Sequence, residues 1–584
     1  MLLVLVISFF SCTDHKQDSK PNVAIITGKV DVNWDDKIKL SNGAITLTDS
    51  WIDRLNLGDS IIQLEKDGTF KIELFIQKAD FYILSHEANS IELFVSPNDS
   101  LYIDFNSENI VSGTSEKLNH HLKALRNNIN TNKKYINEID FYNQPVEVVD
   151  SILDSLKTAY IKIHKDFKQN NKVNDAFEKK ILADITYRNK LYKISHPSLF
   201  KQKTGNALPI QATYYEDIAR GSFDSPELLK SLDYVLFIES YTDAQSAGEN
   251  KYDTYWQIPM EKIHPKYNQI EQLDAHQDIK DYLLHQHLNK SMDNYGMVYL
   301  KDLIPRVKVD CKNPALVKQI EERFQEGLER RKEASIIKIY KKIDGIELEA
   351  HIFYPEDFKE GEKRPAYLFF HGGGWAIGIP EWGYTNCKEY SSKGMVAISF
   401  EYRLIDIHKT NILDCIRDAK SAILWTREEA EMLGIDPNKI VAAGFSAGGH
   451  LAAATAIINN FDVEENTSGL SAKPNAIVIQ SASYNTTQSN WFARQSDQKP
   501  KSISTFHHLE KGLVPSLFFH GTADHLAPIS EFTEFKDKMD SLGNDYEYKI
   551  FEGVGHFFNS PEANKTVQKM TDDFLEKLGY IEKQ

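Results

Sequence analysis

The chain has 584 residues, of which 41% are hydrophobic and 26% charged, and its formal net charge is −16. This length exceeds what one hydrophobic core supports, and it predicts about two to four globular domains. The acidic balance argues against a nucleic-acid partner and against electrostatic attraction to an anionic membrane, and it favours a small neutral substrate.

The first segment, residues 1–22, resembles a bacterial lipoprotein signal followed by a polar linker. The run Met1–Phe10 is apolar but too short to cross a bilayer as a helix, although no Lys or Arg precedes it. Ser11 precedes Cys12, and polar residues follow. Cleavage there would leave Cys12 as the lipidated first residue and anchor the protein to a membrane. The expected location is the bacterial cell envelope, lipid-anchored or periplasmic; the alternative is a plain signal peptide with an incidental cysteine.

Residues 23–112 predict a small antiparallel β domain, similar to a sandwich. Apolar and polar residues alternate in several short runs that are separated by turn residues. Asp67-Gly68 lies between the alternating runs 61–65 and 69–76, and such a pair predicts a hairpin.

Residues 113–336 predict a helical region, because long, charge-rich stretches such as 146–170 and 176–195 contain almost no glycine. We expect His120 and His121 to be solvated or structural. The whole front half, with Ser96–Leu101 before a strand, resembles the front of envelope-anchored thiol–disulfide oxidoreductases. In that family a thioredoxin domain follows, but this chain has no Cys-x-x-Cys, so the resemblance implies no redox activity. Cys311, Cys387 and Cys415 are too widely spaced to predict a disulfide framework or a metal site.

Residues 337–584 predict an α/β domain with a mostly parallel sheet and helices on both faces. Short apolar runs, typical of buried parallel strands, alternate with amphipathic stretches. The expected strands are 366–370, 395–400, 440–443, 476–479, 516–519 and 546–551, and the expected helices are 414–433, 447–459, 531–542 and 561–578.

A candidate nucleophile lies in residues 440–450, IVAAGFSAGGH. Gly444-Phe445-Ser446-Ala447-Gly448 matches the G-x-S-x-G elbow, in which the serine occupies a sharp turn between a strand and a helix. The expected strand precedes it and the expected helix follows it, so we predict Ser446 as the nucleophile.

Candidate oxyanion donors lie in His371-Gly372-Gly373-Gly374-Trp375, directly after an expected strand. Glycines after a strand expose backbone N–H groups that can stabilise a tetrahedral oxyanion. We predict the amides of Gly372, Gly373 and Ala447 as the donors, and we expect His371 to brace the loop.

A serine nucleophile needs a base and an acid that orients the base, and in this fold the chain order is Ser, Asp, His. Asp524 ends the stretch HGTAD after one expected strand, and His556 follows the next in GVGHFF. Both lie at strand ends, where active sites of parallel sheets gather. The competing candidates fit less well because of their neighbours or their order in the chain; they are His450, Asp497, His507, His508 and His525.

Together HGGGW, Glu401-Tyr402-Arg403-Leu404, GFSAGGHLAA, HGTAD and GVGHFF resemble the hormone-sensitive-lipase-like carboxylesterases, in particular the carbohydrate-ester or feruloyl-type branch. The resemblance covers residues 340–580. It implies hydrolysis of short-chain acyl esters, such as acetyl or feruloyl esters of saccharides, with no metal or organic cofactor. Members usually continue Tyr-Arg-Leu with Ala-Pro, whereas residues 405–408 read Ile-Asp-Ile-His here.

Two other functions stay open at this point. A serine peptidase of the prolyl-oligopeptidase type has the same elbow and triad, although the HGGGW motif and the lack of a propeller-like repeat argue against it. Alternatively, the front half is an envelope binding module that carries a minor esterase activity.

Overall fold

The structure is a computed structural model, and it describes residues 22–30, 37–41, 60–86, 89–105, 109–138, 141–204, 206–246, 260–459, 469–488, 492–493, 495–497, 499–558 and 560–583. Cys12 and the expected lipoprotein signal lie outside these residues. The chain divides into two compact units. One comprises residues 1–255 and 268–283, and the other comprises residues 256–267 and 284–584.

The first unit begins with two four-stranded sheets that share one hydrophobic core. Their orders are β4-β1-β7-β8 and β3-β2-β5-β6, and all pairings are antiparallel except β1 with β7. Buried and less buried residues alternate along β1 and β4, as the sequence pattern predicts. The strands are β1 (Val23–Lys29), β2 (Lys37–Ser41), β3 (Ser60–Gln63), β4 (Thr69–Phe75), β5 (Asp80–His86), β6 (Asn89–Val95), β7 (Ser100–Asp104) and β8 (Asn109–Gly113).

The turn at Asp67-Gly68 forms, but the expected hairpin is wrong. Gly68 has φ 79°, and the Gly68 amide donates to the Glu65 carbonyl at 2.9 Å. The flanking strands β3 and β4, however, pair in different sheets, β3 with β2 and β4 with β1. The physical reason is that each strand finds its hydrogen-bond partner far away in sequence, and the turn therefore connects the two layers of the sandwich.

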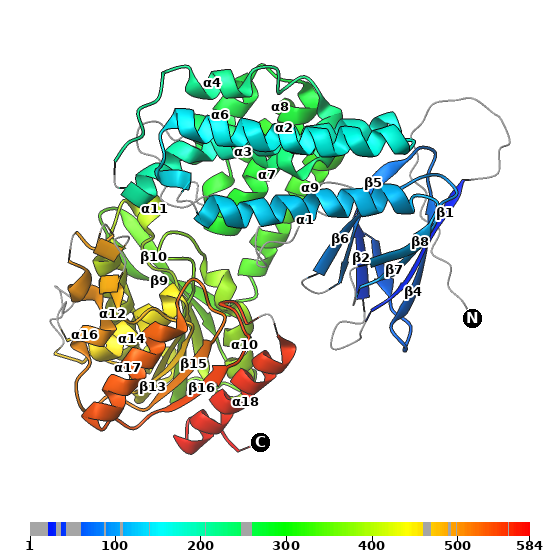
Figure 1. Cartoon of the computed structure of the whole chain (residues 1–584). Helices are drawn as coiled ribbons and strands as arrows, with labels where there is room; N and C mark the ends of the chain where they lie inside the picture. Colours follow the sequence, from blue (N-terminus) through cyan, green and yellow to red (C-terminus); the bar gives the residue numbers. More distant parts are fainter. Residues whose placement is uncertain are drawn as a thin grey trace. The chain divides into compact units, whose positions relative to one another are not determined.

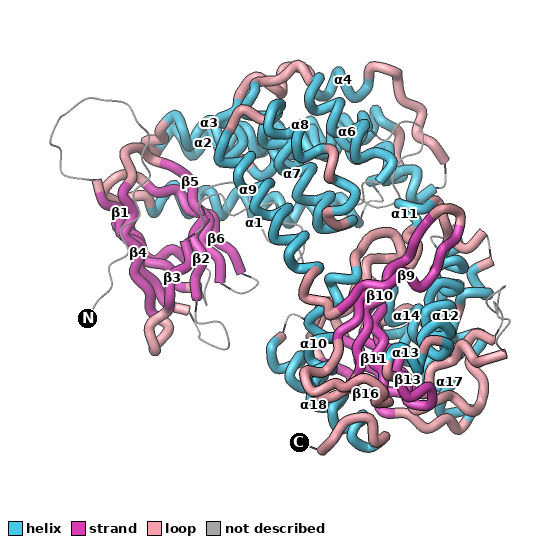
Figure 2. Tube along the Cα trace, turned by 180° about the vertical axis from the view of Figure 1, so that it is seen from behind, coloured by secondary structure: helices cyan, strands magenta, loops and turns pink. Residues whose placement is uncertain are grey.

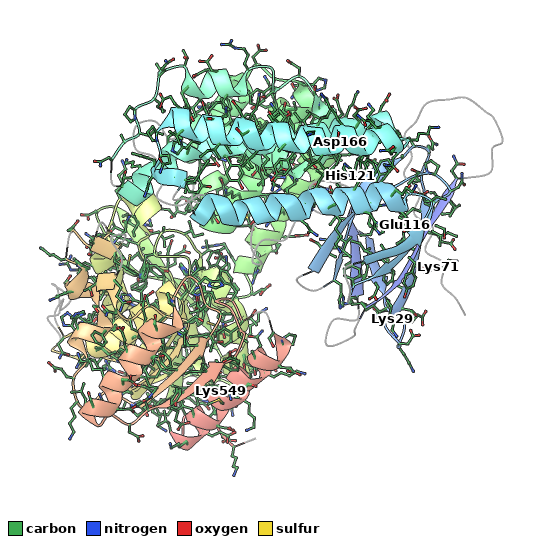
Figure 3. The ribbon with its side chains drawn as sticks, viewed as in Figure 1. Lys29, Lys71, Glu116, His121, Asp166 and Lys549 are labelled. Carbon is green, nitrogen blue, oxygen red and sulfur yellow. The ribbon has the colours of Figure 1, made fainter. Side chains whose placement is uncertain are left out.

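The helices of the first unit pack beside the sandwich (Figure 1). They are α1 (Glu116–Glu138), α2 (Val146–Asn170), α3 (Asp175–Thr204), α4 (Tyr214–Ala219) and α5 (Leu232–Ser246). Figure 3 labels His121 on α1. The side chain is buried, its ring stacks on Phe167 at 3.9 Å between ring centroids, and its Nε2 lies 3.1 Å from His164 Nδ1. Phe167 and His164 both lie on α2, so His121 packs where the two helices meet.

The second unit is built on an eight-stranded sheet of order β16-β15-β14-β13-β11-β12-β10-β9. Strands β11 to β16 are parallel, whereas β9 and β10 form an antiparallel hairpin at the edge beside β12. The bounds are β9 (Ile336–Ile343), β10 (Ile346–Phe353), β11 (Arg364–Phe370), β12 (Val396–Phe400), β13 (Ile435–Phe445), β14 (Ala476–Gln480), β15 (Ser516–Gly521) and β16 (Glu547–Phe551). The expected mostly parallel α/β fold is confirmed.

Helices cover both faces of this sheet (Figures 1 and 2). Buried residues of α12, α14 and α17 pack on one face, and those of α10 and α18 pack on the other. Asn411 and Ser560 cap α12 and α18 with side-chain hydrogen bonds, so these helices begin where capping chemistry places them. The bounds are α10 (Tyr384–Ser392), α11 (Ile405–His408), α12 (Ile412–Glu428), α13 (Ala430–Leu433), α14 (Ala447–Ile457), α16 (Thr505–His508), α17 (Ile529–Leu542) and α18 (Pro561–Lys577).

The second unit also contains helices that precede the sheet in sequence. The division falls within α6 (Met260–Gln272) and α7 (Gln277–Tyr295), and α8 (Leu303–Asp310) and α9 (Pro314–Arg331) belong wholly to this unit. The compact unit therefore includes residues from 284 onward, whereas the sequence pattern changes at residue 337. In the described part of the chain, no helix combines the length and apolarity needed to cross a membrane.

Candidate active site

The Gly-x-Ser-x-Gly segment forms a strained turn between β13 and α14. Ser446 has φ 55° and ψ −121°, a conformation that non-glycine residues rarely adopt. A Cβ atom at Gly444 would lie 2.3 Å from the Gly448 carbonyl oxygen, and one at Gly448 would lie 1.9 Å from that of Phe370. The turn therefore requires both glycines, and it projects Ser446 from the carboxyl end of a central strand.

The structure brings the three predicted triad residues together. The Ser446 hydroxyl oxygen lies 2.9 Å from His556 Nε2, and His556 Nδ1 lies 2.7 Å from Asp524 Oδ2. His556 and Asp524 follow β16 and β15, which are adjacent in the sheet, and both side chains are buried. The short distance to a carboxylate oxygen means that Nδ1 carries a proton and donates it, which leaves Nε2 free to accept one from the serine.

The surroundings of Asp524 fix the orientation of its carboxylate. Oδ1 accepts hydrogen bonds from the amides of Leu526 at 2.9 Å and Ala527 at 2.8 Å, so Oδ2 faces His556. His520 Nε2 lies 3.7 Å from Oδ2 but donates to the Ala527 carbonyl at 2.7 Å. Burial lowers the pKa of His520, so this ring stays neutral and does not compete with His556 for the carboxylate.

The predicted oxyanion donors lie in two places next to the elbow. Gly372 packs on Phe445, where an added Cβ would lie 2.9 Å from the ring, and Gly373 has φ 111°. Ala447 is the first residue of α14, where backbone amides point away from the helix and attract negative charge. Among the described residues, the amides of these three have no hydrogen-bond acceptor.

His371 braces the glycine loop, as expected. Its Nδ1 donates to the Gly372 carbonyl at 2.7 Å, and its ring stacks on Tyr402 at 4.4 Å between centroids. The Tyr402 hydroxyl donates to the His371 carbonyl at 2.8 Å. Burial lowers the pKa of His371 to about 4, so the ring is neutral and is a poor general base near pH 7.

The competing candidates lie away from the serine–histidine pair. His450 is buried behind the elbow, where Nε2 donates to the Ile503 carbonyl at 2.7 Å, and burial lowers its pKa to about 4. Asp497 accepts a hydrogen bond from Asn411 at 2.9 Å. His507 bonds Ser504 at 2.8 Å, and His525 is exposed.

Two supporting residues were not predicted. The Ser481 hydroxyl, directly after β14, donates to the His556 carbonyl at 3.1 Å and so helps to hold the catalytic loop. Tyr402 belongs to the Glu-Tyr-Arg-Leu stretch but was given no role. A polar residue just after a parallel strand is the only signal that the sequence offers for Ser481.

The segment 405–408, which departs from the Ala-Pro pattern, forms the short helix α11. The Ile405 amide donates to the Trp375 carbonyl at 2.9 Å, and His408 Nδ1 accepts from the Leu404 amide at 2.9 Å. Burial lowers the pKa of His408 to about 4. The substituted segment therefore packs directly on the HGGGW loop. Among the described residues, no group of three or more His, Cys, Asp or Glu is placed to hold a metal ion.

The chain is similar to known esterases. Residues 351–539 match the family model BD-FAE. An arylesterase of Saccharolobus solfataricus is 27% identical over 41% of this chain and 81% of its own length. Esterase LipC of Mycobacterium tuberculosis is 27% identical over 35% of this chain and 55% of its own length. A propionate-bound esterase, Est2 of the planctomycete Thermogutta terrifontis, is 35% identical over 43% of this chain and 97% of that chain, with a TM-score of 0.41.

The C-terminal domain is thus a carboxylic ester hydrolase domain with the α/β-hydrolase fold. The chain spans about half the length of several of the curated relatives that it matches.

Proposed function

We propose that the protein is a serine carboxylesterase that hydrolyses short-chain acyl esters, with acetyl or feruloyl esters of saccharides as its substrate class. The hydrogen-bond series from Ser446 through His556 to Asp524, at 2.9 and 2.7 Å, is the observation that carries the proposal. The match to the BD-FAE family model and the esterase relatives support ester chemistry. The saccharide class rests on the motif resemblance.

In the proposed mechanism, His556 Nε2 removes the Ser446 proton as the serine oxygen attacks the ester carbonyl. Asp524 holds the ring in the tautomer that makes Nε2 an acceptor, and it stabilises the imidazolium that forms. The amides of Gly372, Gly373 and Ala447 stabilise the oxyanion. His556 then protonates the leaving alcohol, and it activates the water that hydrolyses the acyl-enzyme.

Replacement of the nucleophile tests the mechanism. Ser446→Ala is expected to lower kcat for a nitrophenyl acetate by about 10⁴- to 10⁶-fold, because a triad member is lost while binding groups remain. Ser541→Ala is the control, since this serine is exposed on α17, donates to the Lys538 carbonyl and has no role in the proposed mechanism. A Ser446→Ala protein that keeps more than about a tenth of the wild-type rate would contradict the assignment.

A substrate panel tests the class of ester. We expect acetylated or feruloylated sugars to have a higher kcat/KM than methyl esters of the same acids, because the saccharide then contributes binding energy. A dipeptide nitroanilide should not be cleaved. Preferential cleavage of the peptide would instead favour a prolyl-oligopeptidase type of activity.

The location is a separate proposal. We propose that a lipid on Cys12 anchors the protein in the bacterial cell envelope, on the basis of the short apolar run that ends at Ser11-Cys12. The front half would then determine location or access of large substrates.

A further inference from the structure

The glycine loop with the proposed oxyanion donors is tied at its far end to helices that precede the sheet. The Gly378 amide donates to the Asn294 carbonyl, near the end of α7, at 2.9 Å. Gly378 has φ 126° and passes so close to His371 that an added Cβ would lie 2.3 Å from Nδ1. Movement at this contact would therefore reach His371, whose ring holds the Gly372 carbonyl.

A second tie joins the same loop to the end of α9. Arg331 donates to Glu381 Oε1 at 3.1 Å and to Glu349 Oε2 on β10 at 2.6 Å, so one guanidinium bridges the loop and the sheet. Arg330 donates to the Glu381 main-chain carbonyl at 3.2 Å. Glu381 lies in the short 3₁₀ helix Pro380–Gly383 and is buried. The planar fork of arginine suits two carboxylates at fixed positions, which a lysine cannot match.

The groups around Arg331 make this tie costly to lose. The carboxylates of Glu349 and Glu381 contact the Arg331 guanidinium, and Glu349 also contacts the buried ring of His351. Burial opposes ionisation of Glu349, but hydrogen bonds from His351 and Arg331 lower its pKa to about 2. Without Arg331, the buried Glu381 carboxylate would lose the cation that donates to it.

The loop itself is short and internally bonded. The Gly373 carbonyl accepts from the amides of Ala376 and Ile377 at 3.1 Å each, and an added Cβ at Gly373 would lie 2.0 Å from the Ile377 carbonyl oxygen. Trp382, next to Glu381, packs edge-on to His371 at 5.9 Å between centroids. Because this loop is so closely packed, a displacement of Glu381 would also displace Gly372 and Gly373.

We propose that Arg331 is a positioning residue for ester hydrolysis: it fixes Glu381, and through it the loop that carries the Gly372 and Gly373 amides. The inference rests on the proposed function, because those amides matter only if they stabilise an oxyanion. It makes the end of α9, which precedes the residues matched by the family model, a functional part of the site.

The test compares Arg331→Met with Lys332→Met in the full-length protein. Lys332 is the matched control because it follows Arg331 directly and, among the residues that the structure describes, forms its ion pair with exposed Glu329. We expect Arg331→Met to lower kcat for a small activated ester by about 10- to 100-fold, because small displacements of reacting groups have effects of this size. KM should change less than about threefold, since the loss falls on the transition state. Lys332→Met should keep wild-type kcat and KM.

Further variants separate positioning from folding. Arg331→Lys should recover part of kcat, because an ammonium reaches one carboxylate but not both. Glu381→Gln keeps the shape of the side chain and removes its charge, so it should lower kcat with KM unchanged. This variant tests the same contact if Arg331→Met folds poorly. The rate at which a fluorophosphonate labels Ser446 should fall with kcat, since that reaction also develops negative charge at the oxyanion position. Circular dichroism checks that each protein is folded.

The outcomes distinguish failure of the positioning role from failure of the proposed esterase function. If the wild type does not hydrolyse esters, or Ser446→Ala keeps its rate, the proposed function fails. If activity depends on Ser446 but folded Arg331→Met or Glu381→Gln keeps kcat within twofold of wild type, the positioning role of Arg331 is overturned. A fall in kcat at constant KM supports it.

Discussion

Replacing Asp524 with asparagine tests whether the structure has identified the group that sets the His556 tautomer. The carboxylate has two unequal oxygens: Oδ1 accepts from two backbone amides, and Oδ2 accepts from His556 Nδ1. An asparagine must place its NH₂ group at one of these positions. If the NH₂ faces the two amides, donors face donors, and two N–H groups lose their acceptor.

The size of the effect follows from this asymmetry. Each buried N–H group without a partner costs about 1–3 kcal/mol, so two cost about 2–6 kcal/mol. The orientation with the NH₂ group towards His556 is therefore favoured over the reverse orientation. At about 1.4 kcal/mol per factor of ten, the ratio of the two populations is about 30 to 10⁴. Facing an NH₂ donor, Nδ1 becomes the acceptor and Nε2 carries the proton, so the ring cannot take the proton of Ser446.

We therefore expect Asp524→Asn to lower kcat by about 10²- to 10⁴-fold with KM nearly unchanged. The assay is steady-state hydrolysis of a nitrophenyl acetate at a pH where the wild type is fully active. Asp497→Asn is the control, because Asp497 is exposed and accepts a hydrogen bond from Asn411. Retention of more than a tenth of wild-type kcat in Asp524→Asn would refute the tautomer argument.

Two other predictions concern stability and location. Burial, together with the nearby Glu349, raises the pKa of Glu401 from 4.5 to about 8. The folded protein therefore binds this proton more tightly than the unfolded chain does, and it loses stability as pH rises through that interval. Glu401→Gln should reduce the fall in Tm between about pH 5 and about pH 9, and an unchanged fall would contradict this prediction. Cys12→Ala should move the protein from the detergent phase to the aqueous phase in a phase-partitioning assay, and equal partitioning of variant and wild type would rule out the anchor.

The parts of the site that sequence could predict are those whose causes are local. The Ser446 elbow needs a strand, two glycines and a helix within a few residues, and chain order then points to Asp524 and His556. The parallel sheet follows from apolar runs of strand length. The position of Ser481 against the His556 carbonyl follows from sheet order, which pairs strands that are distant in sequence. The ties from Asn294 and Arg331 to the glycine loop have no motif at all, because any helix can carry an asparagine or an arginine.

The contacts of Asn294 and Arg331 with the glycine loop determine how much of the chain the site needs. Every proposed catalytic group lies between Gly372 and His556, so the sequence alone predicts that residues 337–584 fold independently and hydrolyse small esters at near wild-type kcat/KM. A chain that begins at residue 337 keeps Glu349 and Glu381 but loses Arg330, Arg331 and Asn294. It therefore retains the carboxylates and removes the guanidinium that neutralises them.

We now expect this shortened chain to have a lower kcat than the full-length protein, by about the 10- to 100-fold assigned to Arg331, and a lower Tm. A chain that begins at residue 284, where the compact unit resumes, keeps all three anchoring residues and should retain more activity. Both are compared with full-length protein on the same small ester, after circular dichroism confirms folding. Equal kcat in a folded 337–584 chain and in full-length protein would show that the loop holds its position without the preceding helices. A loss restored by beginning at residue 284 would show that these helices form part of the esterase, because a small ester needs no help with access to the site.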